Sequence, residues 1–483
     1  MPEYRAPGVY VEETSFRSRA IAAVETAIPV FIGYTRKVSA RGSAVTAGKP
    51  RRVADMKDFA KLYGQSPLHD MAVNVVKRVD AAGRLLDVAV TWDAFDPVPS
   101  HFLSHAVQLY FANGGTDCFV HSLGRFREAR KADFLAALQA LEDFAGPTLL
   151  VLPDAALLDD ADHAAVLEAA LASAARSGGR FVIADVPRAF PGSSDTAAEV
   201  DARFRAGVTG DPALLRNGAA YFPYLETELP LRTSDGRIRF ARFDVVTVAR
   251  DGSETTAPVP RAGERAFAVA LKSKEPEVYR AVKAFIAEAR ATLPPSGAVA
   301  GLFARIDATR GVWEVPAGAA LLKVARPAVA VNDTFHETLN NDSAGGKSVN
   351  AVRFFTGRGN LVWGARNLAG NDNEWRYVNV RRFALFLEAS IDQGTQWAVF
   401  EPNDANTWTQ LRKAAEDFLL GLWREGALQG TKPEQAFTVQ VGLGTTMTQQ
   451  DIDQGRLILQ VGFAPLRPAE FVMLRIVHKM QAP

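Results

Sequence analysis

The sequence predicts a multi-domain protein of the mixed α/β class, and three observations lead to this prediction. The chain has 483 residues, which is enough for about three domains of about 150 residues each. Between residues 130 and 190, helical patterns alternate with short apolar runs, as in folds that are built on a parallel sheet. Both ends of the chain carry apolar, β-forming segments, although chain ends are usually polar.

The charge and cysteine content exclude several classes of protein. Lys and Arg number 55 against 54 for Asp and Glu, so the net charge of +1 gives no sign of a nucleic-acid or membrane-surface binder. The single cysteine, Cys118, excludes an intramolecular disulfide and fits folding in a reducing cytoplasm. The start of the chain lacks the pattern of a secretory signal, and there is no apolar run of about 18 residues. We therefore expect synthesis in the cytoplasm and no membrane insertion.

The alternating region is expected to form the central sheet. A helix over Phe134–Phe144 leads to a strand over Thr148–Pro153, and a helix from Asp159 to Arg176 leads to a strand over Phe181–Asp185. Both strands are continuous apolar runs, which is typical of parallel strands covered on both faces. Ile28–Tyr34 has the same character and is the first buried strand that the sequence predicts.

The pattern changes between residues 230 and 265. Residues 237–248 alternate with a period of two, and turn-forming Asp-Gly pairs occur at Asp235 and Asp251. This pattern predicts an antiparallel hairpin or a small β insertion.

The C-terminal region predicts an amphipathic helix over 404–425, followed by strands over 436–441, 456–463 and 471–478. One face of this helix is apolar, with side chains at spacings of three and four: Trp408, Leu411, Ala415, Phe418 and Leu422. The charged residues that point away from this face are Arg412, Lys413, Glu416 and Asp417. The final strand is apolar on both faces, so it needs neighbouring strands and cover on both sides.

Few residues suggest catalysis or metal binding. Asp154 and Asp185 lie close to the C-terminal ends of two predicted parallel strands, where α/β enzymes place polar groups, although such residues often only cap loops. His101 and His105 have the spacing of a zinc helix but lack its glutamate, and a third histidine, His121, would have to approach them. Residues 344–348, Ala-Gly-Gly-Lys-Ser, fail the phosphate-loop pattern because Asn341 replaces its first glycine. We expect no enzyme activity, no cofactor and no metal.

Several short phrases, in order along nearly the whole chain, resemble those of contractile phage-tail sheath proteins. The phrases are Ala6-Pro-Gly-Val-Tyr-Val-Glu-Glu13, Phe31-Ile-Gly-Tyr34, Ala106-Val-Gln-Leu-Tyr-Phe-Ala-Asn-Gly-Gly115, Ala219-Ala-Tyr-Phe-Pro-Tyr224, Pro294-Pro-Ser-Gly-Ala-Val-Ala-Gly301, Ile306-Asp-Ala-Thr-Arg-Gly-Val-Trp-Glu-Val-Pro-Ala-Gly318, Val362-Trp-Gly-Ala-Arg-Asn367, Tyr377-Val-Asn-Val-Arg-Arg382 and Phe400-Glu-Pro-Asn403. The resemblance is weakest over 230–290, and Val362–Asn367 departs from the family, which often has Thr after the Arg.

The resemblance implies a division of the chain. Residues 1–27 would be an N-terminal arm, and 28–229 with 292–343 a middle α/β domain. A variable outer insertion would cover 230–291, and an inner domain would cover 344–483 with a C-terminal β arm. In this family both arms add strands to a sheet in neighbouring subunits. The arm residues expected to make these contacts are Val9, Tyr10, Val11, Phe471, Met473, Leu474 and Ile476.

The resemblance also implies partners and a mechanism. The chain would polymerise with itself around an inner tube, joined by baseplate and terminal cap proteins, and contract without hydrolysing nucleotide. Arg412, Lys413, Glu416 and Asp417 would face the tube. A phage tail, an R-type tailocin released by lysis and an extracellular contractile injection system stay open, as does the presence of sister sheath subunits. The competing interpretation is a cytosolic α/β enzyme with a site near Asp154 and Asp185.

Overall fold

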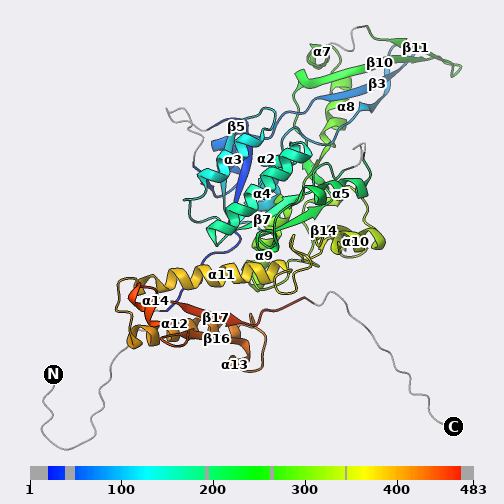
Figure 1. Ribbon diagram of the computed structural model, residues 1–483. Helices are drawn as coiled ribbons and strands as arrows, with labels where there is room; N and C mark the ends of the chain where they lie inside the picture. The colour runs from blue at the N-terminus through cyan, green and yellow to red at the C-terminus, as the bar shows by residue number, and fades with distance from the viewer. Residues whose placement is uncertain (1–19, 39–48, 191–194, 261–265, 343–344, 469–483) are drawn as a thin grey trace, which may run out of the picture. The chain divides into compact units, whose positions relative to one another are not determined.

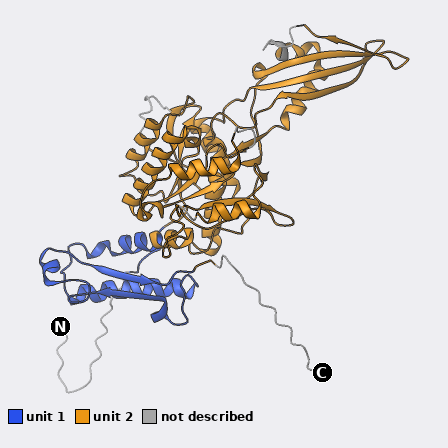
Figure 2. Ribbon diagram, turned by 45° about the vertical axis from the view of Figure 1, so that its right-hand side comes forward, with its two compact units in different colours: residues 1–24, 386–466 blue, residues 25–385, 467–483 orange. Residues whose placement is uncertain are grey.

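The computed structural model describes residues 20–38, 49–190, 195–260, 266–342 and 345–468 (Figure 1). The chain divides into two compact units (Figure 2). Unit 1 contains residues 1–24 and 386–466, and unit 2 contains residues 25–385 and 467–483. The boundary between the two units falls inside helix α11 (Val378–Thr395). None of the helices in the described ranges has the length and apolar character that a membrane crossing requires.

Unit 2 is built on an eight-stranded sheet in the order β15-β14-β8-β7-β6-β1-β5-β2. The strands, in that order, are Gly359–Trp363, Val349–Phe355, Gly218–Phe222, Phe181–Asp185, Leu149–Val151, Pro29–Thr35, Cys118–Arg125 and Arg51–Val53. All neighbouring pairs from β14 to β5 are parallel, whereas β15 and β2 join the two edges as antiparallel strands. The middle strands β1, β6, β7 and β8 are buried at every position, as the continuous apolar runs predict.

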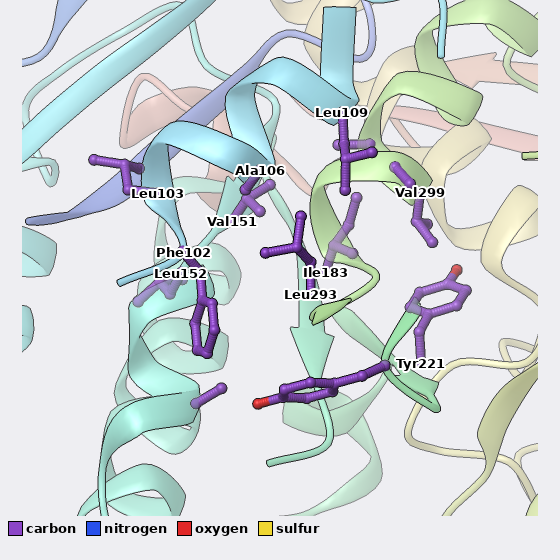
Figure 3. Packing of buried hydrophobic residues seen from close by; sticks show 14 of the residues in the cluster. Phe102, Leu103, Ala106, Leu109, Val151, Leu152, Ile183, Tyr221, Leu293 and Val299 are labelled. Atoms are coloured by element: carbon purple, nitrogen blue, oxygen red, sulfur yellow. The ribbon is translucent and has the colours of Figure 1, made fainter. Parts of the chain in front are cut away.

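Helices α2 (Leu103–Ala112) and α9 (Ser296–Arg310) pack closely on each other beside this sheet (Figure 3). Two glycines make this approach achievable. A Cβ atom at Gly297 would lie 2.4 Å from the Ala106 carbonyl oxygen, and one at Gly301 would lie 2.4 Å from the Tyr110 carbonyl oxygen. Since the glycines are four residues apart, they lie on one face of α9. Any side chain at either position would push the two helices apart.

Two smaller sheets complete unit 2. One has the order β11-β10-β3-β4, formed by Glu254–Pro258, Ile238–Val248, Met71–Asp80 and Leu85–Ala94. The other has the order β12-β9-β13, formed by Arg290–Leu293, Leu225–Pro230 and Val324–Pro327. The predicted hairpin is present, because β10 pairs antiparallel with β11. On its other side β10 pairs in parallel with β3. The sequence pattern did not predict a strand at β3.

The remaining helices of unit 2 connect these sheets. They are α1 (Met56–Tyr63), α3 (Lys131–Ala140), η1 (Pro153–Leu157), α4 (Asp160–Ser177), α5 (Ala197–Gly207), α6 (Pro212–Leu215), η2 (Asp235–Arg237), α7 (Ala266–Lys274), α8 (Pro276–Ala287) and α10 (Asp333–Asn340). The expected alternation is confirmed, with α3 before β6 and α4 before β7.

Unit 1 contains the C-terminal half of α11 and a helix-covered β-hairpin. Its other elements are η3 (Gln396–Ala398), α12 (Ala405–Arg424), α13 (Pro433–Ala436), β16 (Phe437–Val441), α14 (Gln449–Asp453) and β17 (Leu459–Phe463). The mixed α/β class is therefore confirmed in both units. The structure divides the chain at residue 386, and β14 and β15 lie in the large sheet of unit 2. The division into an arm, a middle domain, an outer insertion and an inner domain from residue 344 stays a prediction.

Candidate assembly surface

Unit 1 presents a β-hairpin that has two strands in the part of the chain that the structure describes. β16 and β17 pair antiparallel from Phe437 opposite Phe463 to Val441 opposite Leu459. One face of the hairpin carries Phe437, Val439 and Val461, which are partly buried, and the other carries exposed polar residues such as Gln440 and Gln460. This alternation is what a sheet with one covered and one solvated face requires.

Both outer edges of the hairpin lack a further strand among the residues that the structure describes. Among the described residues, the chain on the outer side of β17 pairs with it just beyond its end, where Gln429 donates its backbone N–H to the Ala464 carbonyl and Leu428 forms a β-bridge with Pro465. An isolated two-stranded sheet is marginally stable in water, and its open edges are ready to pair with other chains. The hairpin is therefore a site where added strands would gain backbone hydrogen bonds.

Helix α12 covers the apolar face of this hairpin. The Asp404 side chain begins the helix by accepting hydrogen bonds of 3.0 Å from the backbone N–H groups of Asn406 and Thr407. The predicted apolar stripe faces inward: Leu411 and Ala415 are fully buried, and Phe418 and Val439 both pack against the small core that contains Ala415. The helix is therefore fixed on β16 by the residues that the sequence pattern selected.

The four charged residues of α12 that the sequence analysis selected are all exposed. Lys413 and Asp417 form an ion pair of 3.5 Å one turn apart. Arg412 differs from the others, because its Nη2 donates a hydrogen bond of 2.9 Å to the Val441 carbonyl at the end of β16. Arg412 therefore holds the hairpin as well as contributing charge, whereas Lys413, Glu416 and Asp417 are the residues more available to a partner.

The segment that precedes β1 lies against helix α11 in unit 1. Ile21 lies in the small core of unit 1 with Ala414 and Ala415, and the Val24 backbone N–H donates to Ser390 Oγ at 3.2 Å. A Cβ atom at Gly394 would lie 2.8 Å from Ile21, so this glycine allows the segment to lie against the helix. The arm residues Val9–Val11 and Phe471–Ile476 lie outside the described residues, and their role stays a prediction.

Asp154 has a structural role at the start of α2. Its carboxylate accepts backbone N–H hydrogen bonds from Tyr34 at 2.7 Å, Phe102 at 2.5 Å and Leu103 at 3.2 Å. The residue is completely buried, and burial raises the pKa of its carboxyl although the three donors oppose the shift. The Asp154 carboxylate thus joins β1 to the start of α2. Its hydrogen bonds are supplied by three backbone N–H groups, so no substrate is needed to explain its burial.

Asp185 has the same role at the start of α9. It accepts hydrogen bonds from the Ser296 backbone N–H at 2.8 Å and from Ser296 Oγ at 2.5 Å. Burial raises the pKa of the Asp185 carboxyl to about 7, and the hydrogen bonds from Ser296 oppose this shift. The cavity that Asp185 lines measures about 20 Å³, which has room for about one water molecule but not for a substrate. The two carboxylates thus fix helices α2 and α9 on the sheet.

The three histidines considered for a metal site are buried and do not form one. His101 Nε2 is bonded to the Arg127 carbonyl at 2.8 Å, and burial lowers the pKa of His105 to about 4. No group of three His, Cys, Asp or Glu side chains in the described ranges could hold a metal ion.

Sequence comparisons match the region that contains this surface. The model of the phage tail sheath C-terminal domain matches residues 370–479, which include all of the hairpin and α12. The tail sheath protein of Enterobacteria phage T4 is 25% identical over 189 residues, and that of Vibrio phage KVP40 is 23% identical over 188 residues. The T4 match covers 38% of this chain but only 27% of the phage protein, so this chain matches about a quarter of the length of these relatives.

Structural comparisons cover nearly the whole chain. A chain of the anti-feeding prophage baseplate structure is 28% identical, with a TM-score of 0.63 over 99% of this chain and 100% of that one. The contracted helical sheath of the anti-feeding prophage is 27% identical, with a TM-score of 0.61 over 98% and 99% of the two chains. The contracted sheath complex of PVC, an extracellular contractile injection system, is 25% identical, with a TM-score of 0.63 over 99% and 98%.

Residues 370–479 thus match the phage tail sheath C-terminal domain, and the fold of the chain is similar to that of chains in contractile sheath assemblies. The similarity over nearly the full length is to chains of the anti-feeding prophage and of PVC.

The pKa of Asp185 predicts a measurable pH dependence. The folded-state pKa of about 7 is above the ordinary value of about 3.9, so between these pH values the folded protein keeps a proton that the unfolded chain releases. The free energy of unfolding should therefore fall as pH rises from 4 to 7, by about 2–4 kcal/mol from this group. Asp185→Asn should remove this contribution, so urea midpoints at pH 4.5 and 7.5 should differ less than in wild type. Parallel pH profiles would show that Asp185 is ionised in the folded protein.

Proposed function

We propose that this chain is the structural subunit of a contractile tail sheath, which polymerises helically around an inner tube and drives that tube through a target membrane. The observation that carries the proposal is the two-stranded hairpin with open edges inside the region that matches the sheath C-terminal domain. The similarity over nearly the full length to two contracted sheaths supports it.

The subunits are joined by strand addition. Val9–Val11 of one neighbour and Phe471–Ile476 of another pair with the outer edges of β16 and β17, so that each hairpin becomes the centre of a larger sheet. Backbone hydrogen bonds hold such a contact whatever the side chains are, and every added strand buries apolar side chains against α12. Because each subunit gives its arms to others, the contact is heterologous and does not close on itself, which produces a helix.

Contraction is a change of packing and uses no nucleotide. The sheath assembles in an extended, metastable state, and a signal from the baseplate releases it to a shorter, wider and more stable one. The subunits rotate as nearly rigid bodies while the arms keep neighbours connected. The rigidity required of unit 2 has a structural basis in the close α2–α9 contact and in the caps that Asp154 and Asp185 provide.

The other partners follow from this function. They are the inner tube, the baseplate, a terminal cap protein and, where a particle has them, sister sheath subunits. The exposed charges of α12 (Lys413, Glu416 and Asp417) are proposed to face the tube, together with Arg412. Assembly takes place in the bacterial cytoplasm, and the product is a phage tail or a phage tail-like particle.

Deletion of residues 1–20 should leave a folded monomer that cannot polymerise. The cut spares Ile21 and Val24, which hold the chain on α11, so unit 1 keeps its described contacts. In negative-stain electron microscopy, the purified full-length protein should form hollow cylinders wider than a bare tube, and the truncated protein should form none. Circular dichroism and thermal unfolding provide the control for folding. Cylinders formed by the truncated chain would contradict the proposed role of the N-terminal arm.

Charge reversal on α12 should weaken loading on the inner tube. Lys413→Glu places a third negative charge beside Glu416 and Asp417 without touching the Arg412–Val441 bond. We expect the amount of sheath that sediments with tubes to fall several-fold, more strongly at low salt than at high salt. The double variant with Arg412→Glu should lose more, and part of its loss should appear as lower stability. Unchanged loading by Lys413→Glu at low salt would exclude this face as a tube contact.

A further inference from the structure

Among the described residues of unit 1, the exposed large apolar side chains are concentrated at one end. They are Val399, Phe400, Leu443 and Ile458, with exposed fractions of 58%, 102%, 50% and 39%. We call these four residues the apolar end patch. They come from three segments: the α11–α12 connection, the loop after β16 and the residues before β17. Figure 1 shows α14 and the α11–α12 connection at the end of unit 1 opposite α13.

Side-chain contacts connect the three segments. Asn403 Nδ2 donates a hydrogen bond of 3.0 Å to the Arg456 carbonyl, which joins the α11–α12 connection to the residues before β17. Trp408 Nε1 donates to Asn403 Oδ1 at 2.7 Å, and a Cβ atom at Gly442 would lie 3.5 Å from the Trp408 ring. Thr446 Oγ1 donates to the Ile458 carbonyl at 2.7 Å. The apolar end patch is therefore held on an ordered framework.

Phe400 occupies a backbone position that favours glycine. Residues 398–401 form a type II turn: the Glu401 N–H donates to the Ala398 carbonyl at 3.1 Å, and Val399 has φ −65° and ψ 125°. Phe400 is the third residue of this turn and has φ 74°, in the left-handed region that type II turns usually fill with glycine. The chain thus accepts backbone strain to keep an aromatic residue here.

The strain brings no benefit within the described part of the chain, because the Phe400 side chain is fully exposed. Strained backbone persists where the surrounding structure enforces it, and it is concentrated at sites that bind a ligand or partner. A projecting aromatic ring on a rigid turn is the form of an anchor residue, which fills a pocket on a partner.

The size of the patch indicates which partner it fits. The four side chains expose about 400 Å² of apolar surface, so a contact there would bury about 800 Å² over both partners, below the total of about 1,200 Å² or more that a stable protein–protein interface buries. Such a contact is too small to tether two sheath subunits through contraction. When it is repeated on every subunit along a helix, many weak contacts add up, and each can still be released individually.

We propose that the apolar end patch is an anchor for the inner tube, with Phe400 inserted into an apolar hollow on the tube surface. The extended sheath makes this contact at every subunit and gives it up on contraction. The inference rests on the proposed sheath function and adds a second, apolar element to the charged face of α12. It predicts that tube loading keeps a component that high salt does not remove.

The variant Phe400→Gly tests this inference, because it removes the ring and supplies the residue that the turn favours. Its unfolding midpoint should equal or exceed that of wild type, while the amount that sediments with purified tubes at 0.5 M salt should fall at least five-fold. Polymers formed without tubes should be unchanged. Phe354→Ala is the matched control, since Phe354 is an exposed phenylalanine of β14 in unit 2 with an exposed fraction of 60%. It should load on tubes like wild type.

The other outcomes are distinct. If Phe400→Gly and Phe400→Ala both load on tubes like wild type, the tube anchor is wrong. If they lose the tube-free polymers instead, the patch contacts another copy of this chain or its arm, and the inference is again overturned. If wild type itself forms neither tube-free polymers nor sheaths on tubes, the proposed function fails, and the inference fails with it.

Discussion

The rest of the structure depends on one constraint: the two-stranded hairpin of β16 and β17 needs further strands at its edges. β16 and β17 are covered on one face by α12 and have polar side chains on the other, and no further strand lies at their edges among the described residues. The unpaired N–H and C=O groups of an edge strand can bond to water, but they can also pair with other chains and cause aggregation unless a specific partner covers them. In the proposed sheath the partner is another copy of the same chain, and the open edge is the proposed bond between subunits.

The other features of the chain fit this requirement. A sheath subunit has to transmit force, so the bonds between subunits should be adaptable while the subunits themselves stay rigid. In unit 2, rigidity comes from local features: Gly297 and Gly301 let α2 and α9 touch through their backbones, and Asp154 and Asp185 fix the starts of these helices on the sheet. The buried Arg382–Asp307 pair, with two hydrogen bonds of 2.5 and 2.9 Å, adds a further fixed contact between α11 and α9.

Periodic patterns carried most of the sequence-based prediction. The runs at β1, β6 and β7 are apolar without interruption, and the stripe from Trp408 to Leu422 repeats at helical spacing, so these elements could be predicted. Two features could not. The pairing of β3 with β10 joins residues about 170 positions apart, and neither strand contains a signal for its partner. Phe400 belongs to a short sequence that resembles the sheath family, but its left-handed backbone conformation could not be predicted. Glycine and asparagine are the residues that usually indicate such a conformation, and phenylalanine does not. The two aspartates were found by position, and only their hydrogen bonds revealed that they cap helices.

The most direct test of the account is hydrogen–deuterium exchange at the backbone amides of residues 437–441 and 459–463, compared between the soluble monomer and the assembled polymer. In the monomer, the N–H groups on the outer edges of β16 and β17 should exchange quickly. If strands from neighbouring subunits are added there, exchange at these edges should slow by roughly a hundredfold or more on assembly, while the strands of the large sheet in unit 2 change little. Equal exchange in monomer and polymer would show that the hairpin edges are not the bond between subunits.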